Sequence, residues 1–168
     1  MSVEENIQFT TMPLSTGPRL HYVERGDPKG DAIVFLHGYS DSWFSFSRVL
    51  PLLSLEYHAF ALTQRGHGDS DKPECCYTPE DFAADVDAFM DVVGIEKTTV
   101  VGASTGALFA QGVALSHPRR LSRLVLVGAQ TPANEGVMGL VEEVRALEDP
   151  VPPEFVRGFQ ESTIHQPV

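Results

Sequence analysis

The chain has 168 residues, of which 42% are hydrophobic and 21% charged, which is typical of one globular domain with a substantial core. Its formal net charge of −11 works against nucleic acid and anionic membrane surfaces as partners. Residues 1–8 are polar and acidic rather than a signal peptide, and the sequence has no apolar run of about 18 residues, so we expect a cytoplasmic protein.

The first part of the chain predicts strands. Residues 7–12 and 19–24 are short runs joined by a turn, which indicates a hairpin. Residues 32–36 are continuously apolar, as in a parallel-sheet strand that is covered on both faces. An apolar-periodic helix is expected at 43–53. We interpret its aromatic residues as core rather than as the mouth of a pocket; they are Trp43, Phe44 and Phe46.

A strand at 57–62 leads into a long polar loop at 64–76. Gly66 and Gly68 in this loop are followed by neither a third glycine nor a Lys-Ser/Thr pair, so we predict a structural role rather than phosphate binding. The chain's two cysteines, Cys75 and Cys76, are adjacent and lack metal-ligand spacing. We predict that both are free thiols.

The next helix has clear boundaries. Thr78 is its expected N-cap, with Pro79 at the first helical position, and Gly94 its expected C-terminal stop. Four apolar residues share one face: Phe82, Val86, Phe89 and Val93. Three carboxylates lie off that stripe, and we interpret them as a solvated face rather than a metal site; they are Asp85, Asp87 and Asp91.

Residues 98–110, TTVVGASTGALFA, read as a strand that turns sharply into a helix with Ser104 at the apex. Gly102 and Gly106 leave room where backbone approaches backbone, and the N-terminal N–H groups of the helix would point toward the serine. The sequence therefore predicts a nucleophile elbow. A strand-to-helix turn with a capping serine is the alternative.

The helix after the elbow is small and apolar nearly all round up to Ser116, so we expect it to be buried, with His117 as the partner of its C-terminal dipole. A strand follows at 121–127, and helical patterns lie at 137–147 and 154–160. The alternation predicts an α/β fold, with a mostly parallel twisted sheet of about six strands, an N-terminal hairpin and helices on both faces.

A dinucleotide site is the competing interpretation of the glycine-rich turn. Leu108 stands where a third glycine is wanted, and the strand at 121–127 ends at Gly128-Ala129-Gln130 without an acidic residue for a ribose. We therefore do not expect a dinucleotide cofactor at this turn.

Three motifs now follow one another in order: His37-Gly38, Arg65-Gly66-His67-Gly68-Asp69-Ser70 and Gly102-Ala103-Ser104-Thr105-Gly106. With them, residues 20–130 resemble the α/β-hydrolase fold superfamily, most closely its esterase, perhydrolase and epoxide-hydrolase-like branch. The resemblance implies that Ser104 is the nucleophile and that the backbone N–H groups of Tyr39 and Thr105 form an oxyanion hole. His37 is expected to order the oxyanion loop. A serine at the apex argues against the aspartate-nucleophile relatives, namely dehalogenases and epoxide hydrolases.

In this superfamily the order is serine, acid, histidine, and the last two follow later strands. We expect residues 1–130 to hold strands 1–6 of the core, and 131–168 to begin a helical cap, the rest of the cap and the C-terminal core being absent. Within the chain, Glu135 and His165 are the candidates for acid and base. Such a truncated core would leave the strand at 121–127 as an apolar edge that self-associates or pairs with the missing part.

The motifs and the resemblance together imply a serine hydrolase that acts on small carboxylic esters or related acyl compounds through an acyl-serine intermediate, without a metal or an organic cofactor, and incomplete in this chain. The alternative is a non-catalytic protein of the same fold that binds a ligand or a partner.

Overall fold

The structure is a computed structural model that describes residues 7–129, 139, 142–147 and 151–163. The chain divides into two compact units, Met1–Gln130 and Thr131–Val168. The second unit contains helix α4, Pro153–Thr163, at the helix expected from 154–160. Of the helix expected at 137–147, residues 142–145 are helical and part lies outside the described residues. The interpretation of this unit as a cap stays a prediction.

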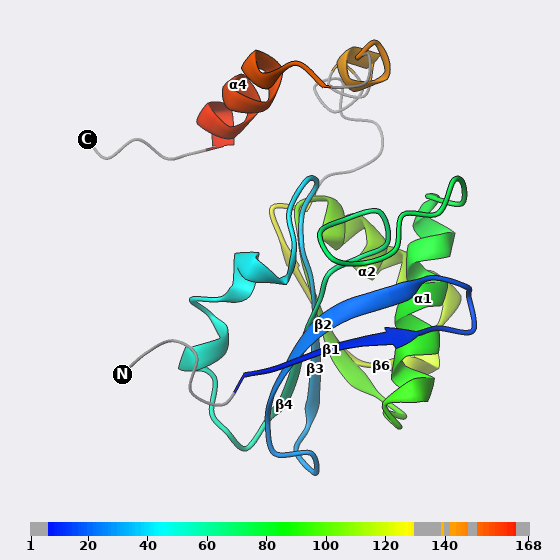
Figure 1. The fold of residues 1–168 in the computed structure, drawn as a ribbon. Coiled ribbons are helices and arrows are strands. Elements are labelled where there is room, and N and C mark those ends of the chain that lie inside the picture. Colours follow the sequence, from blue (N-terminus) through cyan, green and yellow to red (C-terminus); the bar gives the residue numbers. More distant parts are fainter. Residues whose placement is uncertain (1–6, 130–138, 140–141, 148–150, 164–168) are drawn as a thin grey trace. The chain divides into compact units, whose positions relative to one another are not determined.

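The first unit is built on one six-stranded sheet in the order β1-β2-β4-β3-β5-β6 (Figure 1). The strands are β1 Gln8–Pro13, β2 Arg19–Gly26, β3 Ala32–Leu36, β4 His58–Leu62, β5 Thr98–Ala103 and β6 Leu121–Val127. The β1–β2 and β2–β4 pairs are antiparallel, and the β3–β4, β3–β5 and β5–β6 pairs are parallel. This confirms the predicted α/β architecture with its N-terminal hairpin.

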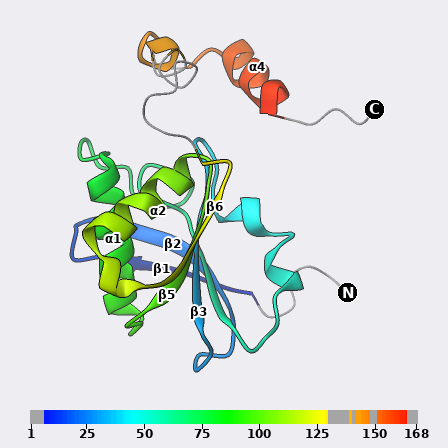
Figure 2. The same ribbon diagram turned by 180° about the vertical axis from the view of Figure 1, so that it is seen from behind.

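Helices cover the two faces of the sheet unequally. Helices α1, Pro79–Val92, and α2, Thr105–Ser116, lie together on one face, and the short 3-10 helices η1, Trp43–Phe46, and η2, Leu50–Leu52, lie on the other (Figures 1 and 2). A third 3-10 turn, η3, Pro118–Arg120, leads into β6. Two apolar clusters result, one under the α-helices and one under the 3-10 helices.

The prediction of one continuous helix at 43–53 is wrong, because the structure has two short 3-10 helices there, η1 and η2. Pro51 has no N–H, so an α-helix that continued through it would lose the bond to the Ser47 carbonyl. The three aromatic residues of this segment differ in burial. Phe46 is buried, Trp43 packs against the apolar cluster under the 3-10 helices, and Phe44 is 66% exposed. The core interpretation therefore fails for Phe44 alone.

Helix α1 begins and ends as its sequence predicts. The Thr78 side chain accepts a hydrogen bond from the Asp81 N–H, and the Asp81 carboxylate accepts one from the Thr78 N–H, which completes a capping box. Pro79 occupies the first turn, and Gly94, at φ +73°, follows the C-terminus. The apolar stripe packs inward through Phe82, Val86 and Phe89.

Helix α2 is covered along most of its length and exposed at its C-terminal end. Ala107, Ala110 and Val113 are buried, whereas Leu115 is 84% exposed. The expected burial therefore holds for residues 105–114, which are buried or half-buried against α1 and the sheet, and fails for the last two residues of the helix, which are exposed.

Strand β6 forms one edge of the described sheet, and four consecutive residues in it are between 37% and 55% exposed: Leu124, Val125, Leu126 and Val127.

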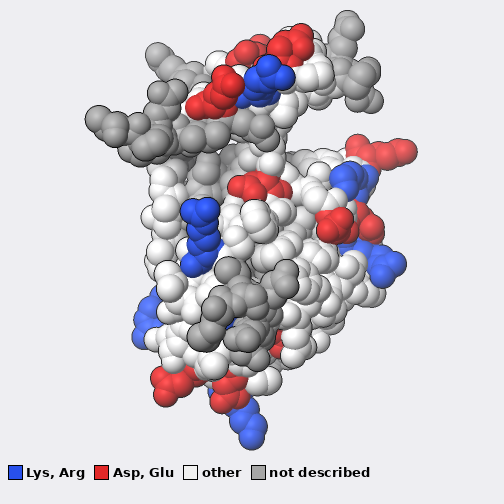
Figure 3. Space-filling model, turned by 60° about the vertical axis from the view of Figure 1, so that its left-hand side comes forward, with Lys and Arg blue, Asp and Glu red and all other residues white. Residues whose placement is uncertain are grey.

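The charged side chains of the surface do not gather by sign on the face that Figure 3 draws. On the face drawn in Figure 3, the described Lys and Arg side chains are scattered among Asp and Glu side chains. Among the described helices, none is long and apolar enough to cross a membrane.

Candidate active site

Ser104 lies at the junction of β5 and α2, where the sequence predicts the elbow. Its φ of 54° and ψ of −120° are rare for a residue with a side chain and persist only where the surroundings enforce them. The Ser104 N–H donates to the Val127 carbonyl at 2.9 Å, and its own carbonyl accepts from the Ala107 N–H at 2.9 Å. Strand β6 and the first turn of α2 therefore hold the backbone of this residue on both sides.

The two glycines that flank the elbow are required by close backbone approach. A Cβ added to Gly102 would lie 2.3 Å from the Gly106 carbonyl oxygen. A Cβ added to Gly106 would lie 2.2 Å from the carbonyl oxygen of Leu36 in β3. Because both obstacles are backbone atoms, neither position has space for a side chain, and this explains the Gly-x-Ser-x-Gly pattern physically.

The segment after β3 runs beside the serine. A Cβ added to Gly38 would lie 3.2 Å from Ser104 Cβ and 3.8 Å from Ser104 Oγ. Tyr39, a predicted oxyanion donor, follows Gly38 directly and is 44% exposed. Thr105, the other predicted donor, is the first residue of α2, where N–H groups have no acceptor within the helix. Both predicted donors thus belong to segments that adjoin Ser104.

His37 is fully buried at the start of this segment, and both ring nitrogens are engaged. Its Nε2 accepts the backbone N–H of Gln64 at 3.0 Å, so Nδ1 carries the proton and donates to the Gly38 carbonyl at 2.7 Å. The Gln64 side chain in turn donates to the His37 carbonyl at 2.9 Å. Burial lowers the pKa of His37 to about 4, which keeps the ring neutral. His37 therefore ties the loop down and is not free to act as a base.

The rings of the other described histidines have hydrogen-bond or ion-pair partners other than Ser104. The contacts of their rings are His21 with Thr63, His58 with Glu24, His67 with the Arg65 carbonyl, and His117 with Asp87. His117 is also the C-cap of α2, where the sequence places it. Within the described part of the chain, no hydrogen bond joins the Ser104 side chain to a histidine. Glu135 and His165 lie outside the described residues.

Sequence reasoning missed a buried ion pair below the loop that follows β4. The Arg65 guanidinium donates from Nε and Nη2 to the two carboxylate oxygens of Asp85, each at 2.6 Å, and both side chains are 4% exposed. The hydroxyl of Thr16 also donates to Asp85. The hydrogen bonds to Asp85 raise the pKa of Arg65 above its ordinary value, so the guanidinium stays charged.

The prediction of a solvated carboxylate face is therefore wrong for Asp85. It holds for Asp91, whose side chain is 65% exposed, while Asp87 is partly exposed and bonded to Arg120. The sequence did contain a sign that Asp85 is buried. It lies three residues after Phe82 and four before Phe89, and residues at this spacing are neighbours on one face of a helix. The partner Arg65 comes from a distant loop and could not be read from that spacing.

The prediction of free thiols is also wrong, because Cys75 and Cys76 form a disulfide between neighbours. The backbone turns sharply there, with Cys76 at φ +73°, and the turn brings the two sulfur atoms together.

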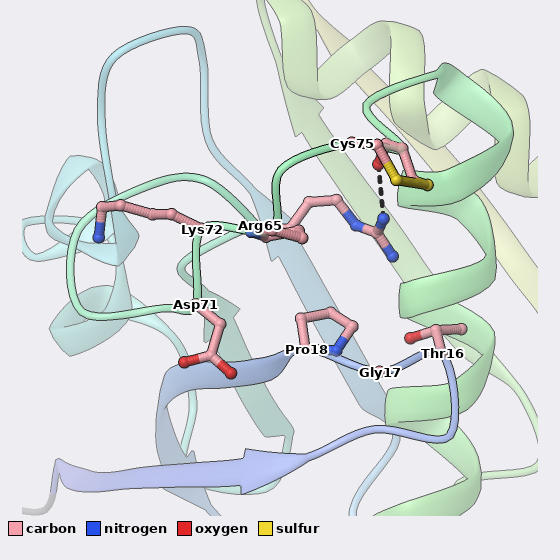
Figure 4. A pocket seen from close by; sticks show the side chains of 9 residues that line it. Thr16, Gly17, Pro18, Arg65, Asp71, Lys72 and Cys75 are labelled. Atoms are coloured by element: carbon pink, nitrogen blue, oxygen red, sulfur yellow. Dashed lines mark hydrogen bonds between the residues drawn. A yellow bond between two sulfur atoms is a disulfide. The ribbon is translucent and has the colours of Figure 1, made fainter.

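Both cysteines line an open pocket of about 530 Å³, and the remaining lining residues are Thr16, Gly17, Pro18, Arg65, Asp71, Lys72 and Pro73 (Figure 4). Neither Ser104 nor the 37–39 segment lines it, so this pocket is separate from the elbow. Among the described residues, no cluster of His, Cys, Asp and Glu is arranged to hold a metal ion.

Comparison with known proteins agrees with this geometry. A family model described as alpha/beta hydrolase fold matches residues 31–161. Epoxide hydrolase B of Mycobacterium tuberculosis is 36% identical over 130 residues, which cover 74% of this chain and 36% of that protein. Epoxide hydrolase 2 of Siraitia grosvenorii is 32% identical over 146 residues, 85% of this chain and 45% of that protein.

The fold also matches solved structures. The crystal structure of an epoxide hydrolase from Vigna radiata aligns with a TM-score of 0.72 at 28% identity, covering 81% of this chain and 43% of that one. Epoxide hydrolase A from Mycobacterium thermoresistibile aligns with a TM-score of 0.69 at 28% identity, covering 80% and 45%. The chain spans less than half the length of each of these proteins.

Proposed function

Because the chain belongs to the alpha/beta hydrolase fold family, we propose that it carries the nucleophile half of a serine hydrolase site that acts on carboxylic esters or related acyl compounds. One observation supports this most directly: Ser104 is held at φ +54° between β5 and α2, with the Gly38 segment alongside. Strain that is enforced from several sides at an exposed apex is a feature of functional residues.

The chemistry follows from this placement. Ser104 Oγ attacks the carbonyl carbon of the ester, and the carbonyl oxygen becomes an oxyanion that is stabilised by the N–H groups of Tyr39 and Thr105. Donors of this kind are each worth about 3–4 kcal/mol elsewhere. The C–O bond to the alcohol then breaks and leaves an acyl-Ser104 ester, which water hydrolyses. The proton of Ser104 needs a base that an acid orients, and in this superfamily both follow later strands of the core. Within this chain, Glu135 is the sequence's candidate for the acid and His165 its candidate for the base.

Esters are a better substrate class than epoxides for a serine at the apex. Attack of a hydroxyl on an epoxide carbon forms an ether, which water does not cleave readily, so the enzyme would stop after one event. Attack on an acyl carbon forms an ester, which water can cleave. The relatives named epoxide hydrolases therefore support the fold and a hydrolytic site, whereas Ser104 favours acyl chemistry.

A non-catalytic role in ligand or partner binding is the second candidate. The observation that favours it is that no described histidine is hydrogen-bonded to the Ser104 side chain. In this case the elbow would be a structural remnant, and Ser104 would react no faster than an ordinary serine.

Covalent labelling of the 168-residue chain separates the two candidates. A fluorophosphonate probe should label Ser104, as mapped by peptide mass spectrometry, and 4-nitrophenyl butyrate should be hydrolysed if His165 supplies the base. Ser104→Ala should abolish both signals. Ser116→Ala, which removes an exposed serine from the other end of α2, should change neither. If the folded chain shows no adduct on Ser104, the proposal is wrong for this chain. Turnover of styrene oxide with no ester hydrolysis would refute the acyl assignment.

A further inference from the structure

The Cys75–Cys76 disulfide lies in the turn that joins the loop after β4 to α1, and both side chains are exposed. Disulfides stabilise proteins mainly by restricting the unfolded chain, and the effect grows with the length of the loop that they close. A bond between neighbours closes almost no loop. Structural stabilisation therefore does not account for this bond, and a chemical role is the better explanation.

The turn around the two cysteines is held by contacts that do not involve sulfur. The Tyr77 hydroxyl donates to the Pro73 carbonyl at 2.7 Å and closes the turn across the cysteines. Arg65 Nη1 donates to the Cys76 carbonyl at 2.5 Å, and Arg65 is itself fixed by the buried Asp85 (Figure 4). Because neither contact involves sulfur, we expect both to persist when the S–S bond is broken, with the two thiols side by side.

A small molecule can reach the sulfur atoms from the open pocket beside the turn, which both cysteines line. Figure 4 shows the Arg65 guanidinium directed toward this turn, while the Lys72 side chain extends away from it. Lys72 Nζ donates to the carbonyls of Gly68 and Ser70, so its position is also set by the loop rather than by the sulfur atoms.

We propose that Cys75 and Cys76 form a reversible thiol–disulfide exchange site for small thiols and disulfides of the glutathione class. The thiolate of the reductant attacks one sulfur, the Cys75–Cys76 bond breaks, and the other cysteine leaves as a thiolate that takes a proton from water. A second reductant thiolate attacks the mixed disulfide, and this step frees the first cysteine and forms the oxidised reductant. Oxidation by glutathione disulfide runs through the same steps in reverse.

Exchange with oxidised glutathione tests the site. The reduced wild-type chain should lose two hydrogens, about 2 Da, and keep no glutathione, because the neighbouring thiol displaces it at once. Cys76→Ser should instead keep one glutathione on Cys75, and Cys75→Ser should keep one on Cys76. After oxidation, iodoacetamide should modify neither cysteine of the wild type until a reductant is added.

A trivalent arsenical reports whether the two thiols stay adjacent. One phenylarsine oxide per reduced wild-type chain should bind and resist excess monothiol, and both single variants should lose this resistance. The urea midpoint of unfolding should be the same before and after reduction, which separates exchange from a structural role. A stable glutathione adduct on the wild type, or two alkylatable thiols after treatment with oxidised glutathione, would overturn the proposal.

Discussion

The Arg65 guanidinium and the Asp85 carboxylate form a doubly hydrogen-bonded ion pair that is almost completely buried. It joins the loop after β4 to the middle of α1, and Thr16 connects the β1–β2 turn to the same carboxylate. Removal of one partner from such a pair leaves an uncompensated charge in the interior, which is costly, whereas replacement of both partners by apolar residues often is not.

Asp85→Ala should therefore lower the free energy of unfolding by about 3–5 kcal/mol in urea denaturation. The double variant Arg65→Met/Asp85→Leu should recover most of that loss. Asp91→Ala is the matched control on the same helix, because Asp91 is 65% exposed in its pair with Arg120, and the loss there should stay within about 1 kcal/mol. Equal losses at Asp85 and Asp91 would contradict the buried pair.

A side chain at Gly106 should destabilise the fold. The Cβ of Gly106→Ala would lie 2.2 Å from the Leu36 carbonyl oxygen, so β3 and α2 have to separate. Overpacking of this kind costs about 1–3 kcal/mol or more, measurable by urea denaturation. Gly158→Ala in α4 is the control, because a Cβ there has nothing within 4 Å and alanine favours a helix. An unchanged midpoint for Gly106→Ala would show that the backbones are farther apart than in this structure.

The burial of His37 predicts a pH dependence of stability. The folded pKa is about 4 against an ordinary value of 6.5, so between these pH values the unfolded chain binds a proton that the folded chain does not. The free energy of unfolding should therefore fall as the pH drops from 6.5 to about 4, by up to about 3 kcal/mol, and this contribution should not change further below pH 4.

Urea denaturation at pH 7 and pH 4.5 checks this contribution. The wild type should lose more stability between the two pH values than His37→Gln, in which the titrating group is removed. His117→Gln, at the end of α2, should retain the wild-type difference. If His37→Gln and the wild type lose the same amount, His37 is not the group responsible.

The edge strand β6 should make the chain self-associate. Leu124 to Val127 are partly exposed at an edge of the described sheet, and these four residues include neither a charge nor a proline, the features that protect sheet edges from pairing with other chains. Light scattering should detect species larger than a monomer, and Val125→Lys should reduce them. Val92→Lys, at an exposed apolar position on α1, should have no such effect. A monodisperse wild-type monomer would count against this prediction.

Features that depend on only a few neighbouring residues, such as helix caps and tight turns, could be predicted from the sequence. The capping box of Thr78 and Asp81 and the small residues around Ser104 follow from steric and hydrogen-bonding needs within a few residues. Contacts between distant segments were not accessible in this way. Asp85 was predicted to be exposed because its ion-pair partner Arg65 lies 20 residues away in the sequence. The continuous helix predicted at 43–53 does not form because Pro51 interrupts it despite the apolar periodicity. Which residue activates Ser104 is likewise a long-range question.

The strand order has a consequence for synthesis on the ribosome. Strand β3 lies in the interior of the sheet, between β4 and β5, but β5 emerges about 60 residues later, roughly 3–12 s at ordinary translation rates. During that interval the apolar residues Ala32–Leu36 have an open side. Slow translation before Thr98, or a chaperone that holds the nascent chain, should therefore affect the yield of native protein more than the same interventions after Ala103.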